Sequence, residues 1–293
     1  MNTRMILVHG LTPIHCGTGQ SIGAIDLPIA RERPTNIPLI PGSSLKGVLR
    51  AAGEVENGSL HEAVFGPDTE EAALFAGSVQ FSDANLACLP VRSIRGTFAW
   101  VTSPYMLRRL LRDASEAGLK LASKVPEPKE VTQALVAELG TVVVKEDKKV
   151  VFEDFDFGAE QSPPLKEAGS AIAKILFDDP DEQTRFVARL VLVHEDVMGV
   201  LLRSSVEVTA RNRIDPDSGT VQKGALWTEE ALPVESILSG VAVATPVTAR
   251  DKKWDAAELL GHVESLVSKG MIQVGGKASV GRGMCRVKLV KGA

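Results

Sequence analysis

Aromatic side chains are scarce in this chain of 293 residues: they make up 4% of it, and Tyr105 is the single tyrosine. Proteins that grip single-stranded bases mainly by ring stacking carry more of them. An excess of positive charge is also absent, since the formal net charge is −4. The molecule as a whole therefore does not attract nucleic acid, and any RNA binding must come from local basic patches.

Cysteine is rare as well. Cys16, Cys88 and Cys285 lie far apart, and none belongs to a CxxC pair. This spacing excludes a zinc knuckle and a disulfide framework, and it indicates a reducing compartment. No apolar run reaches the length of a membrane span, and the N-terminal segment is too short and interrupted for a signal peptide. We therefore expect a cytoplasmic protein without a membrane partner.

The composition is otherwise ordinary, with 44% hydrophobic and 24% charged residues. These values fit a globular protein with a large core, built as one large domain or two small ones. Periodicity and turn signals predict, in order, a strand, a helix, two strands and a helix at residues 5–11, 44–54, 78–84, 91–101 and 105–117. This order is the start of a ferredoxin-like βαββαβ unit, the plan of RRM domains.

Beyond residue 117 the patterns alternate between irregular and regular segments. We expect a linker or mobile insertion at 118–129 and a loop at 162–173. Regular elements are predicted as a hairpin of 142–144 with 150–157, a central strand at 185–195, a helix at 196–203, a strand at 234–247, a helix at 254–268 and two strands within 272–289. The fold class predicted is α+β.

Residues 206–227 differ from the rest, because two alternating segments flank the turn sequence Asp-Pro-Asp-Ser-Gly. The segments are too polar to be buried on both faces, which favours a β-hairpin that projects as an arm. On its return strand Leu226 and Trp227 form an apolar wedge that could enter between bases. Basic side chains beside the wedge would hold the RNA backbone: Arg211, Arg213 and Lys223. The alternative is a hairpin that packs on a neighbouring protein.

Residues 12–50 concentrate groups that could touch a phosphate, a metal or a ribose hydroxyl. Asp26 lies in the apolar context GAIDLPI, close to Arg31 and Arg33, and could hold a divalent ion or orient a ribose 2′-hydroxyl. The alternative is a cap, a turn or an ion-pair partner. His15 is the other nearby group that titrates near neutrality, and a structural role is its alternative.

The sequence Pro-Gly-Ser-Ser before residue 45 predicts a helix start, with Ser43 or Ser44 as the N-cap. Lys46 and Arg50 lie one turn apart on this helix. They could bind successive phosphates, together with the free N–H groups of the first turn. The alternative is a solvated helix face.

A glycine-rich loop near the end of the chain contains Gly275, Gly276 and Gly281 around Lys277 and Arg282. Glycines let backbone N–H groups approach an anion closely, and adjacent cations suit phosphate. The loop is not a Walker A motif, since Arg-Gly replaces Lys-Ser/Thr and a strand follows it. The alternative is a tight connection between two strands.

Three segments together resemble a known family: residues 11–50, the arm RIDPDSGTVQKGALWTEEALP and the loop VGGKASVGRG. The chain resembles the RAMP superfamily, and more closely the repeated backbone subunits of type III-B CRISPR (Cmr) effector complexes. The resemblance implies a ferredoxin-like palm with inserted helical segments and a projecting hairpin thumb. It also implies a filament along a guide RNA that cleaves complementary RNA at regular intervals, using a divalent metal such as Mg²⁺ or Mn²⁺.

The resemblance also assigns roles to residues. Asp26 matches the catalytic, metal-binding aspartate, and His15 matches a supporting residue. Guide contacts are implied for Ser43, Ser44, Lys46 and the glycine-rich loop. After the thumb the family has an acidic pair followed by an aromatic residue. Glu229 and Glu230 keep the pair and are further catalytic candidates, whereas alanine and leucine follow them here.

We therefore predict one RAMP domain over residues 1–293. Its palm comprises about 1–117, 185–205 and 234–293, its insertion about 118–184, and its thumb about 206–232. The expected partners are CRISPR guide RNA, single-stranded target RNA, further copies of the chain and other Cmr-type RAMP subunits. The RNA-binding candidates are Arg31, Arg33, Ser43, Ser44, Lys46, Arg50, Arg211, Arg213, Leu226, Trp227, Gly275, Gly276, Lys277, Gly281 and Arg282.

Three alternatives stay open at this point. The first is a non-catalytic guide-RNA scaffold of the same superfamily, in which Asp26 is structural. The second is a guide-processing endoribonuclease in which His15 is the key residue. The third is an assembly protein whose arm binds only protein.

Overall fold

The structure is a computed structural model that describes residues 2–19, 25–53, 58–71, 73–249 and 251–292. It is a mixed α+β fold with one large sheet, which agrees with the predicted class. In chain order the 13 strands of the sheet are β1 (Asn2–Gly10), β2 (Leu39–Ile40), β3 (Val79–Phe81), β4 (Ala84–Arg92), β5 (Phe98–Thr102), β6 (Gln133–Val136), β7 (Val143–Val144), β8 (Lys149–Phe152), β9 (Phe155–Gln161), β10 (Leu190–Val193), β13 (Ile237–Ala244), β16 (Ile272–Gln273) and β17 (Met284–Val290).

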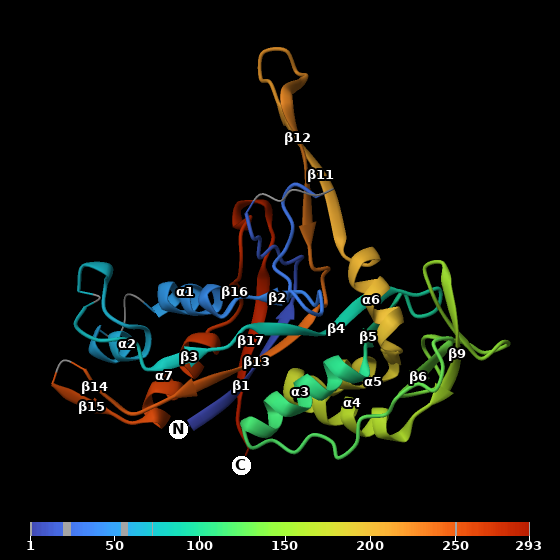
Figure 1. Cartoon of the computed structure of the whole chain (residues 1–293), viewed down its shortest axis with the longest axis horizontal. Coiled ribbons are helices and arrows are strands. Elements are labelled where there is room, and N and C mark those ends of the chain that lie inside the picture. The colour runs from blue at the N-terminus through green and yellow to red at the C-terminus, as the bar shows by residue number, and fades with distance from the viewer. Residues whose placement is uncertain (1, 20–24, 54–57, 72, 250, 293) are drawn as a thin grey trace.

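The helices cover both faces of this sheet (Figure 1). They are α1 (Gly42–Gly53), α2 (Gly58–Phe65), α3 (Pro104–Glu116), α4 (Pro163–Leu176), α5 (Pro180–Arg189), α6 (Glu195–Ser204) and α7 (Ala256–Val267), with short 3₁₀ turns at Thr69–Glu71 and Ala278–Val280. The central part of strand β1, residues 5–8, is apolar without alternation because both of its faces are buried. Ile6 and Val8 belong to the core that includes α1 and α7, whereas Met5 and Leu7 belong to the core that includes α3, α4 and α5. A strand buried on both faces cannot alternate with polar residues.

The centre of the sheet has the order β17–β1–β13–β4, and each neighbouring pair is antiparallel. Met5 of β1 pairs with Val241 of β13 on one side and with Val290 of β17 on the other. The last strand of the chain therefore lies beside the first. This arrangement brings the segment after β1 next to the segment before β17, where the predicted glycine-rich loop lies.

Several predicted boundaries were wrong, each for a local reason. The predicted loop at 162–173 is helix α4, because Ser162 caps its first turn and prolines occupy the first two positions. Helix α5 occupies the first five residues of the predicted strand at 185–195, and only β10 within that range is a strand. The predicted strand at 91–101 is divided between β4 and β5 by a turn in which Gly96 has φ +73°. The predicted helix end at residue 54 lies outside the described residues.

Residues 118–129 contain no helix or strand, as expected for a connecting segment. The chain then adds to the large sheet, because β6 pairs with β10 and β9 pairs with β6. The strand that separates β1 from β4 is β13, which comes from the C-terminal half of the chain. Within the described ranges, no helix is both long and apolar enough to cross a membrane.

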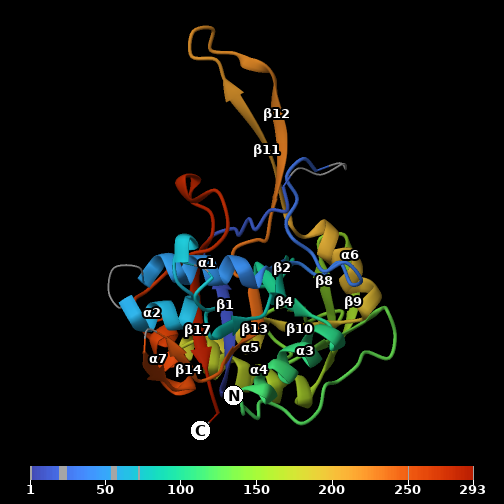
Figure 2. The same cartoon turned by 60° about the vertical axis from the view of Figure 1, so that its left-hand side comes forward.

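Strands β11 (Glu207–Ile214) and β12 (Val221–Ala231) form a separate antiparallel hairpin. The hairpin extends away from the body in both views (Figures 1 and 2). Its turn is closed by the Asp215 carboxylate, which accepts hydrogen bonds from the N–H groups of Asp217 and Ser218. Gly219 follows with φ +67°, a conformation that glycine adopts without strain. The turn residues seen in the sequence therefore form the turn that was expected.

Two further strands, β14 (Val247–Ala249) and β15 (Lys252–Trp254), form a small separate ribbon. It lies at the end of the body away from the projecting hairpin (Figure 1).

Candidate active site at the base of the hairpin

Three segments that are distant in sequence meet where β12 enters the body. Ile14 pairs with Leu232, and Leu27 pairs with Glu229, so the loops after β1 lie along the base of β12. The amide of Gly276 donates to the carbonyl of His15 at 2.8 Å, which attaches the glycine-rich loop to the same place. The base of the hairpin therefore collects His15, Asp26, the acidic pair and Lys277 in one region.

Asp26 lies at the edge of this region, and its side chain is exposed. The Asp26 Oδ2 atom accepts hydrogen bonds from the Thr228 amide at 2.8 Å and from the Thr228 hydroxyl at 2.9 Å. The Thr228 hydroxyl oxygen in turn accepts from the Asp26 amide at 3.0 Å. These bonds from the Thr228 amide and hydroxyl lower the pKa of Asp26 below its usual value, so the group is a carboxylate at neutral pH.

Sequence reasoning did not include Thr228 among the site residues. Thr228 lies directly before the acidic pair, and this position in the sequence was the signal that could have identified it as a site residue. The contact between Thr228 and Asp26 depends on the tertiary structure, because 202 positions separate the two residues in the sequence.

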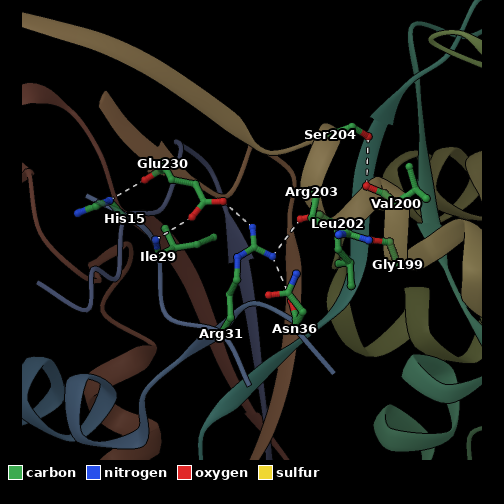
Figure 3. A network of polar contacts seen from close by, with 10 residues as sticks. All are labelled: His15, Ile29, Arg31, Asn36, Gly199, Val200, Leu202, Arg203, Ser204 and Glu230. Carbon is green, nitrogen blue, oxygen red and sulfur yellow. Dashed lines mark hydrogen bonds and ion pairs between the residues drawn. The ribbon is translucent and has the colours of Figure 1, made fainter. Parts of the chain in front are cut away.

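Glu230 is 3% exposed and organises a network of polar contacts with His15, Ile29 and Arg31 (Figure 3). Its two carboxylate oxygens accept from Arg31 Nη2 at 2.5 Å and from the Ile29 amide at 2.9 Å. Arg31 also donates to the carbonyls of Asn36 and Leu202, which ties the loop to the C-terminal end of α6. Arg31 is therefore committed to a buried ion pair inside the protein.

His15 is buried, with 7% of its surface exposed. Its Nδ1 atom lies 2.6 Å from the carbonyl oxygen of Glu230 (Figure 3). A Cβ atom added at Gly17 would lie 2.8 Å from His15 Nε2, so Gly17 packs directly on the ring. His15 thus lies behind the acidic pair, whereas Asp26 faces outward.

Glu229 is also 3% exposed, and it joins the glycine-rich loop to the hairpin. Its carboxylate accepts from Lys277 Nζ at 2.7 Å and from Trp227 Nε1 at 2.8 Å, and Arg211 Nε lies 3.4 Å from its second oxygen. Burial by itself would raise the pKa of Glu229. The bonds from Lys277 and Trp227 and the charges of Lys277 and Arg211 outweigh it and lower that pKa to about 2.

This shift predicts an acid-dependent loss of stability. A carboxyl group whose pKa is depressed on folding stabilises the folded state above its unfolded pKa of about 4.3, and the contribution is lost as the pH falls toward 2. We expect the free energy of unfolding of the isolated chain to decrease over this interval. In Glu229→Gln the decrease should be smaller, because the titrating group is gone. Urea unfolding at a series of pH values measures this, and identical pH dependence in both proteins would contradict the assignment.

The glycine-rich loop is shaped by close packing. Gly275 has φ +82°, and a Cβ atom there would lie 2.4 Å from the carbonyl oxygen of His15. Gly281 also has positive φ, at +78°, and is exposed. Arg282, in contrast, is 7% exposed and donates to the Thr209 hydroxyl at 3.3 Å. The structure thus directs Arg282 into the base of β11, and leaves the tip of the loop open to solvent.

The start of α1 differs from the prediction. The helix begins at Gly42, so neither Ser43 nor Ser44 is its N-cap. The Asp83 carboxylate, from outside the helix, accepts from the Gly42 amide at 2.8 Å and so satisfies an N–H group of the first turn. Ser43 is exposed, and Ser44 and Lys46 are half-buried. Arg50 lies one turn further on and pairs with Asp68 at 2.8 Å.

The remaining RNA-binding candidates fall into two groups. Arg33, Arg213 and Leu226 are exposed, and Leu226 is 69% exposed on the outer part of β12. Arg211 and Trp227 are half-buried and both contact Glu229. The predicted wedge of Leu226 and Trp227 is therefore split, since Leu226 faces solvent and the Trp227 ring nitrogen bonds inward.

Across the part of the chain that the structure describes, no three His, Cys, Asp or Glu side chains form a cluster that could hold a metal ion. Glu229 and Glu230 are already engaged by cations of the protein. Asp26 keeps one oxygen, Oδ1, that accepts no hydrogen bond from the described residues. The site therefore offers a cation one outward-facing carboxylate.

Comparisons with known proteins point to one family. The profile of the RAMP superfamily matches residues 8–286. The chain is 35% identical to the CRISPR system Cmr endoribonuclease Cmr4 of Pyrococcus furiosus, over 99% of this chain and 96% of that protein. It is 25% identical to the CMR subunit Cmr4 of Saccharolobus solfataricus, over 96% and 94% of the two chains.

A solved structure has the same fold. The crystal structure of oligomeric Cmr4 from Pyrococcus furiosus superimposes with a TM-score of 0.75 at 27% identity, covering 100% of this chain and 99% of the other. Since the superfamily profile spans nearly the whole sequence and the fold agrees over its full length, the chain belongs to the RAMP superfamily and is a homologue of the Cmr4 endoribonuclease.

Proposed function

We propose that this protein is a CRISPR RNA-binding backbone subunit of a type III-B effector complex and that it cleaves complementary target RNA at Asp26. One observation carries the proposal: an outward-facing carboxylate lies at the base of a projecting hairpin, in a homologue of a Cmr endoribonuclease. The partners are then the guide RNA, the target RNA, further copies of this chain and other Cmr-type RAMP subunits.

The fold suits a palm and a thumb. The order β17–β1–β13–β4 with all neighbours antiparallel supports a ferredoxin-like palm, in which α1 and α7 would be the two connecting helices. We assign the palm to these elements and the thumb to β11 and β12. In this assignment β5 to β10, which lie between β4 and the thumb in the sequence, belong to insertions that extend the sheet.

The chemistry follows from the placement of Asp26. In the proposed reaction the ribose 2′-oxygen forms a bond to the adjacent phosphorus while the bond from phosphorus to the 5′-oxygen breaks. The 2′-hydroxyl loses its proton, and the leaving 5′-oxygen gains one. A continuous A-form duplex keeps the 2′-oxygen poorly aligned for this step. When a hairpin displaces a base, the ribose 2′-oxygen can align with the adjacent phosphorus. Positioning of this kind contributes several kcal/mol.

The charge state of Asp26 indicates its contribution. A general base works best when its pKa lies near the operating pH, whereas hydrogen bonds from Thr228 hold the pKa of Asp26 low. We therefore assign Asp26 to orienting the 2′-hydroxyl and to binding a cation. Asp26 Oδ1 would hold Mg²⁺ or Mn²⁺ together with water and RNA oxygens, since Mg²⁺ is commonly bound by one or two carboxylates plus substrate phosphates. Such an ion would stabilise charge on the phosphate.

RNA contacts are proposed for the surfaces that face solvent around this site. Ser43 and Lys46 at the start of α1, the tip of the glycine-rich loop and Arg33 offer N–H groups and cations. The exposed Leu226 and Arg213 lie on the hairpin. We propose that Leu226 contacts the displaced base and that Arg213 contacts the backbone beside it.

Removal of divalent ions tests the proposal. In a complex assembled with guide RNA, excess EDTA should lower target cleavage by at least about 100-fold, and added Mg²⁺ or Mn²⁺ should restore it. Retention of guide RNA, measured by filter binding in the same samples, should not change. Cleavage that continues at the same rate in EDTA would refute a metal-assisted reaction. Cutting of repeat RNA by the isolated chain would instead indicate a guide-processing enzyme.

A further inference from the structure

The Thr228 hydroxyl makes two hydrogen bonds with Asp26, the residue proposed to act on RNA. Its hydroxyl donates to Asp26 Oδ2 and accepts from the Asp26 amide, while its own amide donates to the same carboxylate oxygen. Resting on the proposed function, we propose that Thr228 is a positioning residue, which fixes the Asp26 carboxylate relative to the base of the thumb hairpin.

Packing against other side chains does not hold the Asp26 carboxylate in place, because this side chain is exposed. An exposed aspartate ordinarily rotates about its first side-chain bond. Hydrogen bonds to both the amide and the carboxylate of Asp26 restrict this rotation. Among the described residues, Thr228 supplies every side-chain hydrogen bond that Asp26 receives.

Thr228 is itself fixed independently of its hydroxyl. The Leu27 amide donates to the Thr228 carbonyl at 3.1 Å, and the Glu230 amide donates to the Leu27 carbonyl at 3.0 Å. The next two residues are anchored by Lys277 and by Arg31. A change that removes only the hydroxyl therefore leaves the loop and the strand joined.

This arrangement links the carboxylate to the hairpin rather than to the sheet. Thr228 lies on β12, opposite Ala210 of β11, at the point where the hairpin leaves the body. Asp26 follows any displacement of this part of β12 through three hydrogen bonds. The hairpin that displaces a base and the carboxylate that meets the exposed sugar are thus held in one geometry.

The experiment compares Thr228→Val, which is nearly isosteric but lacks the hydroxyl, with Thr228→Ser, which keeps it. Each variant is assembled with guide RNA, and single-turnover cleavage and target affinity are measured. We expect Thr228→Val to cleave about 10- to 100-fold more slowly at unchanged affinity, since small misplacements of a reacting group have effects of this size. Thr228→Ser should remain within about threefold of the parent. Thr248→Val, at an exposed position of β14, is the matched control and should not differ.

A second measurement does not depend on cleavage. The ¹H–¹⁵N heteronuclear NOE of the Asp26 amide in the free chain should decrease in Thr228→Val and not in Thr228→Ser. Full cleavage together with an unchanged NOE in Thr228→Val would overturn the inference. If Asp26→Asn is inactive in that case, only the role of Thr228 is refuted. If Asp26→Asn cleaves like the parent, the proposed function itself fails.

Discussion

Asp26→Asn is expected to reduce target cleavage by about 10²- to 10³-fold, the size of effect seen when one charged or hydrogen-bonding group is removed from a transition state. Asparagine has nearly the same shape and retains an oxygen that can accept from Thr228. It lacks the negative charge that orients the hydroxyl and attracts a cation. The measurement is the single-turnover rate in a complex assembled with guide RNA and a labelled complementary RNA.

Guide binding separates this loss from misfolding. Because Asp26 is exposed, its replacement should not change assembly or the affinity for guide RNA. Asp147→Asn removes an equally exposed carboxylate from the turn between β7 and β8 and serves as the matched control. Cleavage at the parental rate in Asp26→Asn would leave a guide-RNA scaffold without nuclease activity.

Glu230→Ala is expected to have the largest effect on stability. The substitution leaves the Arg31 guanidinium without its carboxylate partner and the Ile29 amide without its hydrogen-bond acceptor. Removing one partner of a buried ion pair costs about 3–5 kcal/mol, because the other charge stays buried and unpaired. The free energy of unfolding from urea titration of the isolated chain should fall by about this amount.

Two comparisons test the cause of that loss. Removing both charges in Arg31→Ala/Glu230→Ala should cost less than the sum of the single changes, since no unpaired charge remains. Asp156→Ala breaks an ion pair with Lys149 whose members are about half exposed, and it should destabilise the fold far less than Glu230→Ala does, because water already screens this pair. A Glu230→Ala protein as stable as Asp156→Ala would show that the network in Figure 3 does not support the fold.

Local patterns predicted the elements whose causes are local. The hairpin was predictable because the turn sequence and the alternation of its strands act over a few residues. Helix α3 and its cap at Ser103 follow from the Ser-Pro pair and an apolar stripe. Helix α4 was missed because glycine and proline in its sequence favour a loop, whereas an apolar face buried against the sheet stabilises a helix.

The same distinction applies to the site. Asp26 was selected as a candidate from its motif, and its exposure and pKa agree with an accessible carboxylate. Arg31 was selected as an RNA contact because arginine is positively charged. The fold instead buries it against Glu230, a partner 199 positions away. No spacing rule relates residues at this distance.

The sequence by itself determined the α+β class and the hairpin with its turn, because short-range periodicity and backbone preference suffice for each. Asp26 was selected from its motif, and its outward orientation is a feature of the fold. Only the tertiary structure decided which charges remain free. The pairing of β1 with β13 and β17 places two acidic residues of β12 among Arg31, Lys277 and Arg211, and leaves Asp26 bound to Thr228 at the surface. Ion pairing depends on distances in space, and the fold alone sets those distances.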